Sequence, residues 1–237
     1  MISRILPSLF TVGNLFLGIV SIILASQGSV EYAAIMVIIG MLLDGLDGRI
    51  ARILHTQSEF GKELDSLSDV ISFGVAPAFI MYVAVLQDMG ALGWGVTALF
   101  PIAGALRLAR FNVKPGVPGY FTGLPITAAG GVLATMTLYH QVFPPIALPL
   151  TMFFLSYLMV SNIKYPNFKK VGIPKTAYYV TPLIILLVVF LAKKYPVQFP
   201  KVVFLPLAIY ALLGIRRAIF RKRKRPFLDD EYESEVE

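Results

Sequence analysis

Four aspartates in the first third of the chain are spaced so that their carboxylates can act together. Asp44 and Asp47 are three residues apart, and Asp65 and Asp69 are four apart. In a helix, both spacings place the two side chains on one face. Each pair lies in or beside an apolar segment, where carboxylates are costly and usually functional. Four carboxylates converging on one point would repel one another unless cations neutralised them, so the spacing predicts a metal site.

Small and basic residues surround these acids. Gly45, Gly48 and Gly61 remove side chains, which lets membrane helices approach closely and lets a bulky phosphorylated ligand reach the backbone. Arg49 and Arg52 place guanidinium groups, which suit bidentate phosphate binding, beside the carboxylates. Oxygen ligands with phosphate nearby favour a hard cation such as Mg2+ or Mn2+. Two such cations could hold a pyrophosphate during an in-line displacement, while one carboxylate takes a proton from an attacking hydroxyl.

The composition is that of an integral membrane protein. Of the 237 residues, 57% are hydrophobic, and the mean hydropathy is +0.73. Soluble domains are nearer ~45–50% apolar. The chain has no cysteine, which excludes disulfides and thiolate metal sites. The net charge of +7 does not indicate nucleic-acid binding, because the basic residues cluster at the ends of apolar segments.

Apolar runs of membrane length predict an all-α bundle of about eight transmembrane helices, with a six-helix catalytic core and two C-terminal helices. The runs lie at residues 8–26, 32–54, 60–86, 92–111, 123–140, 145–162, 177–192 and 202–220. We therefore expect a single transmembrane catalytic domain over residues 1–220. A charged cytoplasmic tail is expected over residues 221–237.

Basic residues determine the expected orientation. All but three of the 21 lysines and arginines fall on one side of the predicted spans, and the exceptions are Lys193, Lys194 and Lys201. The positive-inside rule makes the richer side cytoplasmic, together with both termini and the turn between Asp44 and Asp69. We therefore expect a protein of the cytoplasmic membrane whose acidic site faces the cytoplasm.

The acidic segment resembles the signature of the CDP-alcohol phosphotransferase family. The pattern is D-x-x-D-G-x-x-A-R, eight residues, then G-x-x-x-D-x-x-x-D, and every defined position is filled. These positions are Asp44, Asp47, Gly48, Ala51, Arg52, Gly61, Asp65 and Asp69. Segments at 7–18, 107–112 and 121–125 further resemble the bacterial membrane enzymes of this family that use serine as the acceptor.

The resemblance implies a phospholipid-forming reaction, in which the phosphatidyl group of CDP-diacylglycerol passes to the hydroxyl of L-serine and CMP leaves. By the family pattern, the four aspartates hold two divalent cations, Mg2+ or Mn2+, and Asp69 is also the general base. The positions that match contacts to CDP-diacylglycerol are Thr11, Asn14, Gly48, Arg52, Ser58 and Gly61. The family is commonly dimeric, so we expect a homodimer surrounded by membrane lipids.

The carboxylate of serine should meet a cation. Arg107 and Arg110 lie three residues apart at the cytoplasmic end of the fourth predicted span, and Asn112 and Thr122 add polar groups nearby. We expect one or both arginines to bind the serine carboxylate. Two alternatives stay open. One of the arginines could bind a substrate phosphate, or both could serve only to anchor the span at the cytoplasmic face.

Other functions also stay open on the sequence. A different acceptor, such as glycerol 3-phosphate or inositol phosphate, would want a denser basic pocket than Arg107, Arg110 and Lys114 provide. Acids within the membrane also occur in ion-coupled transporters, although a transporter does not need the glycine and Ala-Arg positions at this spacing. A scaffold with a vestigial metal site is disfavoured because all four aspartates are present.

Overall fold

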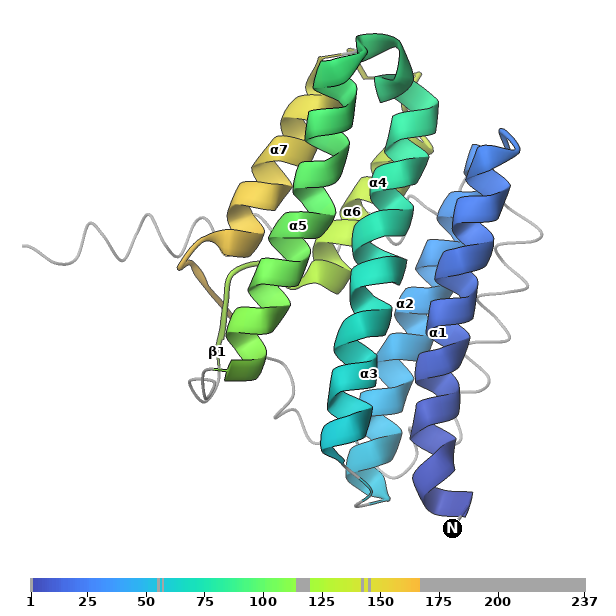
Figure 1. Cartoon of the computed structure of the whole chain (residues 1–237), viewed down its shortest axis with the longest axis vertical. Helices are drawn as coiled ribbons and strands as arrows, with labels where there is room; N and C mark the ends of the chain where they lie inside the picture. Colours follow the sequence, from blue (N-terminus) through green and yellow to red (C-terminus); the bar gives the residue numbers. More distant parts are fainter. Residues whose placement is uncertain are drawn as a thin grey trace, which may run out of the picture.

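The protein is a bundle of long helices (Figure 1). The structure is a computed structural model that describes residues 2–54, 56, 58–113, 120–141, 143–144 and 146–166. The last two predicted spans, at 177–192 and 202–220, lie outside the described residues, as does the predicted tail.

Most of the described residues are helical, and two short strands are the exception to the expected all-α fold. The α-helices are α1 (Ile2–Ser26), α2 (Val30–Ile53), α3 (Glu59–Asp69), α4 (Ala76–Met81), α5 (Ala91–Val113), α6 (Ile126–Thr137) and α7 (Ala147–Val160). Two π-helical turns and one 3-10 turn are η1 (Val70–Val75), η2 (Tyr82–Leu86) and η3 (Gln87–Met89). Strands β1 (Tyr120–Thr122) and β2 (Lys164–Pro166) pair antiparallel, with Phe121 opposite Tyr165.

Three of the described helical segments are long and apolar enough to cross a membrane. They are Ser8–Ser26, Glu59–Met89 and Ala91–Val113. Helix α2 is of similar length, but its C-terminal half carries the charged residues of the acidic motif. Helices α6 and α7 are apolar and shorter. The predicted helical fold is confirmed, and these segments support the prediction of a membrane protein.

Helix α6 begins later than the expected span at 123–140. Gly123 has a positive φ of 80°, and Pro125 stands at the N-cap of the helix. A left-handed residue followed by a proline two positions on does not continue a helix, because proline also restricts the residue before it to extended conformations. The segment before Ile126 is therefore free to form β1 and to cross over the end of α7.

The expected third span is not one regular α-helix. Directly after Asp69 the chain widens into the π-helical turn η1, in which Ser72 donates a 3.0 Å hydrogen bond to the carbonyl of Asn14 on α1. On the other side of η1, Gly130 of α6 approaches the carbonyl of Phe73 so closely that a Cβ there would collide with it. A π turn inserts one extra residue, so the face of α3 that carries the aspartates is out of phase with the face of α4 in the core.

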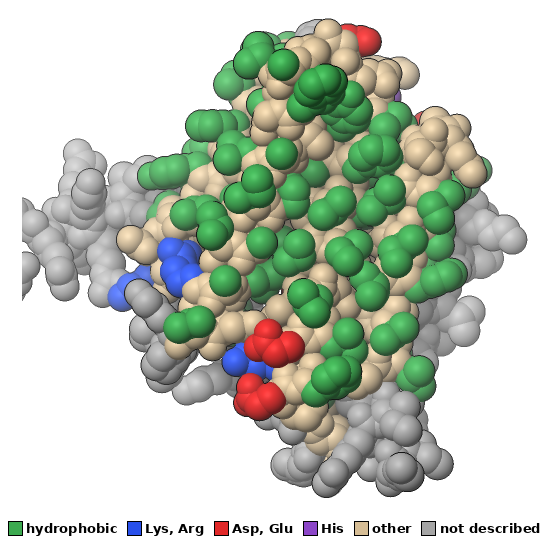
Figure 2. Space-filling view, in the orientation of Figure 1, with side chains coloured by type: hydrophobic (Ala, Val, Ile, Leu, Met, Phe, Trp, Pro, Cys, Tyr) green, Lys and Arg blue, Asp and Glu red, His purple; other side chains and the backbone are tan. Residues whose placement is uncertain are grey.

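The packing places the acidic end of α2 against several other helices. Helices α1 and α2 form a hairpin that packs against α3, α4 and α6, while α5 pairs with α7 (Figure 1). The core includes the fully buried side chains of Phe73, Phe100, Leu133 and Met152. Figure 2 shows hydrophobic side chains along the length of the visible face, with most of its charged side chains toward the lower part. An apolar flank with charge gathered toward one end is what a membrane-embedded bundle requires.

Candidate active site

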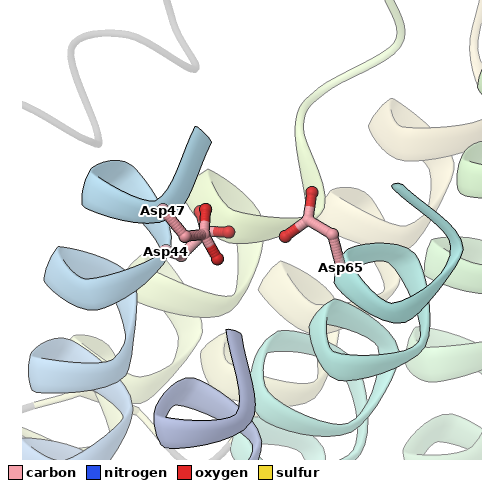
Figure 3. A group of neighbouring side chains, drawn as sticks. All are labelled: Asp44, Asp47 and Asp65. Carbon is pink, nitrogen blue, oxygen red and sulfur yellow. The ribbon is translucent and has the colours of Figure 1, made fainter. Parts of the chain in front are cut away.

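Three of the four aspartates converge between α2 and α3. The carboxylates of Asp44 and Asp47 on α2 point toward that of Asp65 on α3 (Figure 3). One oxygen from each side chain lies within 4.8 Å of the others. Asp47 is buried, and Asp44 and Asp65 are half-buried. The spacing predicted this convergence, and the hairpin between α2 and α3 brings it about.

The fourth aspartate lies one turn deeper in the bundle. Asp69 ends α3, is 7% exposed, and has its side chain in hydrogen-bond contact with that of Asp44. Its Oδ1 atom has no hydrogen-bond partner among the described residues. A partly buried set of carboxylate oxygens, one of them without a hydrogen-bond partner, is the kind of donor set that hard divalent cations bind. The residues present therefore fit the predicted metal centre.

Two threonines from other helices hold the carboxylates of α2. Thr11 on α1 is buried and donates a 2.9 Å hydrogen bond to Oδ2 of Asp47. The backbone amide of Gly48 donates to the other oxygen of Asp47. Thr127, in the first turn of α6, lies with its hydroxyl 3.5 Å from Oδ2 of Asp44. The sequence predicted Thr11 as a ligand contact but missed Thr127, whose only signal was its position two residues beyond the 121–125 segment.

The residues predicted to contact the nucleotide lie around the turn between α2 and α3. The Arg52 guanidinium folds back over Gly48, 3.5 Å from where a Cβ on that glycine would stand. Ser58 is the N-cap of α3, and its hydroxyl accepts a 3.0 Å hydrogen bond from the amide of Gly61. Gly61 approaches so closely that a Cβ on it would lie 3.1 Å from this hydroxyl. Ser58 and Gly61 thus shape the start of the helix that carries Asp65.

Asn14 has a different setting from the other predicted contacts. It lies one turn deeper than Thr11 on α1, is fully buried, and packs against Gly40 of α2, whose added Cβ would lie 2.9 Å from the Asn14 amide oxygen. Neither polar atom of the Asn14 side chain has a hydrogen-bond partner among the described residues. The residue lies beneath the acidic cluster, between α1 and α2.

The four residues predicted to bind serine occupy two environments. Asn112 donates a 3.0 Å hydrogen bond to the hydroxyl of Ser66, so it ties the end of α5 to the turn of α3 that carries Asp65. Arg107 is 6% exposed and has its guanidinium carbon 5.5 Å from the ring centre of Phe111. Arg110 and Thr122 lie instead where α5 and β1 meet the end of α7.

A family comparison places these residues in a known context. The model of the family described as CDP-alcohol phosphatidyltransferase matches residues 4–163. This chain belongs to the CDP-alcohol phosphatidyltransferase family. The resemblance seen in the acidic motif is thereby confirmed. The matched region runs from α1 to the residue before β2, so every site residue named above lies inside the family domain.

Individual members of the CDP-alcohol phosphatidyltransferase family match over most of the chain. The CDP-diacylglycerol–serine O-phosphatidyltransferase of Helicobacter pylori is 41% identical over 224 residues, which cover 90% of this chain and 91% of that protein. The protein of the same name from Bacillus subtilis is 37% identical over 165 residues, 70% of this chain and 92% of its own. The archaetidylserine synthase of Methanothermobacter thermautotrophicus is 40% identical over 172 residues, 70% of this chain and 72% of its own.

Proposed function

We propose that this protein transfers the phosphatidyl group of CDP-diacylglycerol to the hydroxyl of L-serine, giving phosphatidylserine and CMP. The observation that carries the proposal is the convergence of Asp44, Asp47 and Asp65 beside the buried Asp69, in the order and spacing of the family motif. Serine as the acceptor is supported by the names of relatives that are 37% and 41% identical to the chain.

The reaction needs a base, an anion site and a way to neutralise the pyrophosphate. Asp69 takes the proton from the serine hydroxyl while the hydroxyl oxygen of serine forms a bond to the lipid-side phosphorus. The bond from that phosphorus to the bridging oxygen breaks, and CMP leaves with the electron pair. Two divalent cations, Mg2+ or Mn2+, held by the four aspartates would offset the negative charge of the pyrophosphate and of the leaving group.

The turn between α2 and α3 is the proposed binding region for CDP-diacylglycerol. Arg52 folds over Gly48 beside Asp47, where a guanidinium can meet the phosphates in bidentate fashion. The Ser58–Gly61 cap gives the nucleotide a small and polar surface at the start of α3. Thr11 and Asn14 of α1 complete this side of the site; of these, Thr11 already contacts Asp47.

The end of α5 is the proposed binding region for serine. Asn112 holds this end against α3, next to Asp65. Further along the chain, Phe121 lies beside Arg107 and Thr127 lies beside Asp44. Of the two arginines predicted to bind the serine carboxylate, Arg107 would supply the positive charge that meets it, and Arg110 would support this region from the same helix. The polar groups of Asn112 and Thr122 would lie nearby. The seven residues from Phe121 to Thr127 thus connect the surroundings of the Arg107 guanidinium with those of the acidic cluster.

The membrane setting follows from the distribution of charge. We propose that the acidic site and both termini face the cytoplasm, because the lysines and arginines gather on that side of the predicted spans. The catalytic core would consist of six spans, with two further spans after it, and two copies would form a homodimer among membrane lipids.

An acceptor panel tests the proposal. The purified protein is given CDP-diacylglycerol and Mn2+ or Mg2+ with serine, glycerol 3-phosphate or inositol phosphate, and CMP release is followed. We expect release with serine. Release with glycerol 3-phosphate and none with serine would overturn the acceptor while keeping the reaction class. No release with any alcohol would overturn the reaction class as well.

A further inference from the structure

Arg110 has its guanidinium engaged by the carboxyl end of α7. It donates hydrogen bonds to the carbonyls of Met159, Val160 and Ser161, at 3.3, 2.8 and 3.2 Å. It also donates to the carbonyl of Thr122 at 3.2 Å and to Oδ1 of Asn162 at 3.3 Å. The last carbonyls of a helix lack partners within the helix and carry partial negative charge, so a cation stabilises them. All five contacts use the two terminal nitrogens, which are the ones a bidentate carboxylate would need.

Backbone hydrogen bonds hold the segment between β1 and α6 against the same end of α7. The amide of Gly123 donates to the carbonyl of Ile163 at 2.8 Å, and the amide of Leu124 donates to the carbonyl of Leu158 at 3.0 Å. Gly123 has a φ of 80°, and a Cβ on it would collide with the carbonyl of Met159. Arg110, on α5, contacts both β1, at the carbonyl of Thr122, and the end of α7, at the carbonyl of Met159. Arg110 therefore adds a contact with Thr122 to the backbone hydrogen bonds that hold β1 against the end of α7.

The position of β1 in turn determines the surroundings of Arg107. The guanidinium carbon of Arg107 lies 5.5 Å from the ring centre of Phe111 and 5.9 Å from that of Phe121. The two rings are 5.9 Å apart and inclined at 57°. Phe111 belongs to the same helix as Arg107, whereas Phe121 is supplied by β1. Cation–π contacts with two rings restrict where a buried guanidinium can point.

We propose that Arg110 is a positioning residue for the acceptor side of the site. It holds β1 against α7, and through Phe121 it sets the direction of the Arg107 guanidinium, which is the group that meets the carboxylate of the acceptor. The two arginines, three residues apart on one helix, thus have different tasks. This inference rests on the proposed transfer to an acceptor that carries a carboxylate.

Kinetics of two matched variants test the division of tasks. In Arg110→Lys, the compact ammonium cannot reach five acceptors at once, so the serine KM should rise while the KM for CDP-diacylglycerol stays within about twofold. We expect a rise of about 3- to 30-fold, the range that loss of a cation–π contact supports. In Phe121→Leu, which leaves the Arg110 contacts in place, the serine KM should rise by a similar factor.

The double variant Arg110→Lys/Phe121→Leu shows whether Arg110 acts through Phe121. If it does, the serine KM of the double variant is no higher than that of the worse single variant. If the rise in serine KM of the double variant equals the product of the two single rises, Arg110 and Phe121 act independently, which would overturn the inference. An unchanged serine KM in Arg110→Lys, or an unchanged serine KM in Phe121→Leu, would overturn it too.

Amide hydrogen exchange provides a second readout that does not depend on activity. Arg110→Lys should accelerate exchange at Gly123 and Leu124, whereas the matched control Arg107→Lys, on the same helix, should leave these two amides protected. Equal protection of the Gly123 and Leu124 amides in Arg110→Lys and in the unaltered protein would contradict the proposal that Arg110 holds β1 against α7. Failure of the unaltered protein to release CMP with serine would instead contradict the proposed function, so the two failures are distinguishable.

Discussion

The hydroxyl of Thr11 on α1 donates a 2.9 Å hydrogen bond to Oδ2 of Asp47 on α2. Both side chains are buried, and the backbone amide of Gly48 donates to the other oxygen of the same carboxylate. A carboxylate with a donor on each oxygen is held in one orientation while lone pairs remain for a cation. The first helix therefore helps to set the geometry of the proposed metal ligands, although it contributes no carboxylate itself.

Replacing Thr11 tests this support. Thr11→Val keeps the shape of the side chain but removes the donor, so Mn2+ affinity should fall about 10- to 100-fold, as it does when outer-shell partners of metal ligands are lost. Thr11→Ser keeps the hydroxyl and should bind Mn2+ nearly as well as the unaltered protein. Titration of the purified protein with Mn2+, followed by its paramagnetic resonance signal, provides the comparison. Equal affinities in the valine and serine variants would exclude a supporting role.

Asp69 should be needed for turnover more than for binding. In Asp69→Asn the side chain cannot take the serine proton, so CMP release should fall about 100- to 10,000-fold, the usual contribution of a general base. Binding of CDP, measured by calorimetry with Mn2+ present, should be retained in part.

A matched control is Asp88→Asn, because Asp88 is an exposed carboxylate in η3, outside the acidic cluster. It should leave both activity and CDP binding unchanged. Near-normal CMP release by Asp69→Asn would show that another group accepts the proton.

Because the carboxylates of the acidic cluster repel one another, Asp44→Asn should raise the Tm without a divalent metal and lower it, relative to the unaltered protein, when the metal is present. Without divalent cations, removing one of several close negative charges should stabilise the protein, so its Tm in EDTA should rise above that of the unaltered protein. With Mn2+ the order should reverse, because the variant lacks a ligand and gains less from binding. Thermal unfolding in detergent, with and without Mn2+, measures both. A lower Tm for the variant under both conditions would argue against a repulsive cluster.

Chelation should abolish activity reversibly. EDTA is expected to stop CMP release, and excess Mg2+ or Mn2+ should restore it, because the carboxylate oxygens of the cluster match hard cations. Restoration by Zn2+ alone, or full activity in EDTA, would contradict the proposed metal centre.

The close contact between α6 and η1 should make Gly130 sensitive to substitution. In Gly130→Ala, the added Cβ meets the carbonyl of Phe73, which cannot move without shifting the π turn after Asp69. We expect a loss of stability of about 1–3 kcal/mol, typical of an overpacked core, seen as a lower Tm. Gly95→Ala is the matched control, because an added Cβ there has no atom within 4 Å. Equal Tm values in the two variants would mean that the contact is not tight.

The convergence of the aspartates could be predicted from the sequence because its signal is local. The spacing of Asp44 from Asp47 and of Asp65 from Asp69 fixes helix faces, and a short connection brings the two helices together. The family resemblance that this motif suggested is confirmed by a family match over residues 4–163. The roles of these residues in binding and catalysis remain predictions.

What the sequence did not predict depends on contacts between distant segments. Thr127 reaches Asp44 across 83 positions of the chain, and Arg110 reaches Val160 across 50. The spacing of Arg107 and Arg110 left open whether one or both bind the acceptor, and only the fold shows that one meets aromatic rings and the other meets helix carbonyls. The π turn after Asp69 was also missed, because the apolar pattern of a membrane segment does not reveal an inserted residue.

Incorporation of labelled serine into lipid tests the central claim most directly. The purified protein is incubated with CDP-diacylglycerol, Mn2+ and radiolabelled L-serine, and label in the lipid fraction is compared with CMP released. We predict one labelled phosphatidylserine per CMP in the unaltered protein and in Asp88→Asn, with almost no label in Asp69→Asn. CMP release without label in lipid, or equal labelling by Asp69→Asn, would contradict the account.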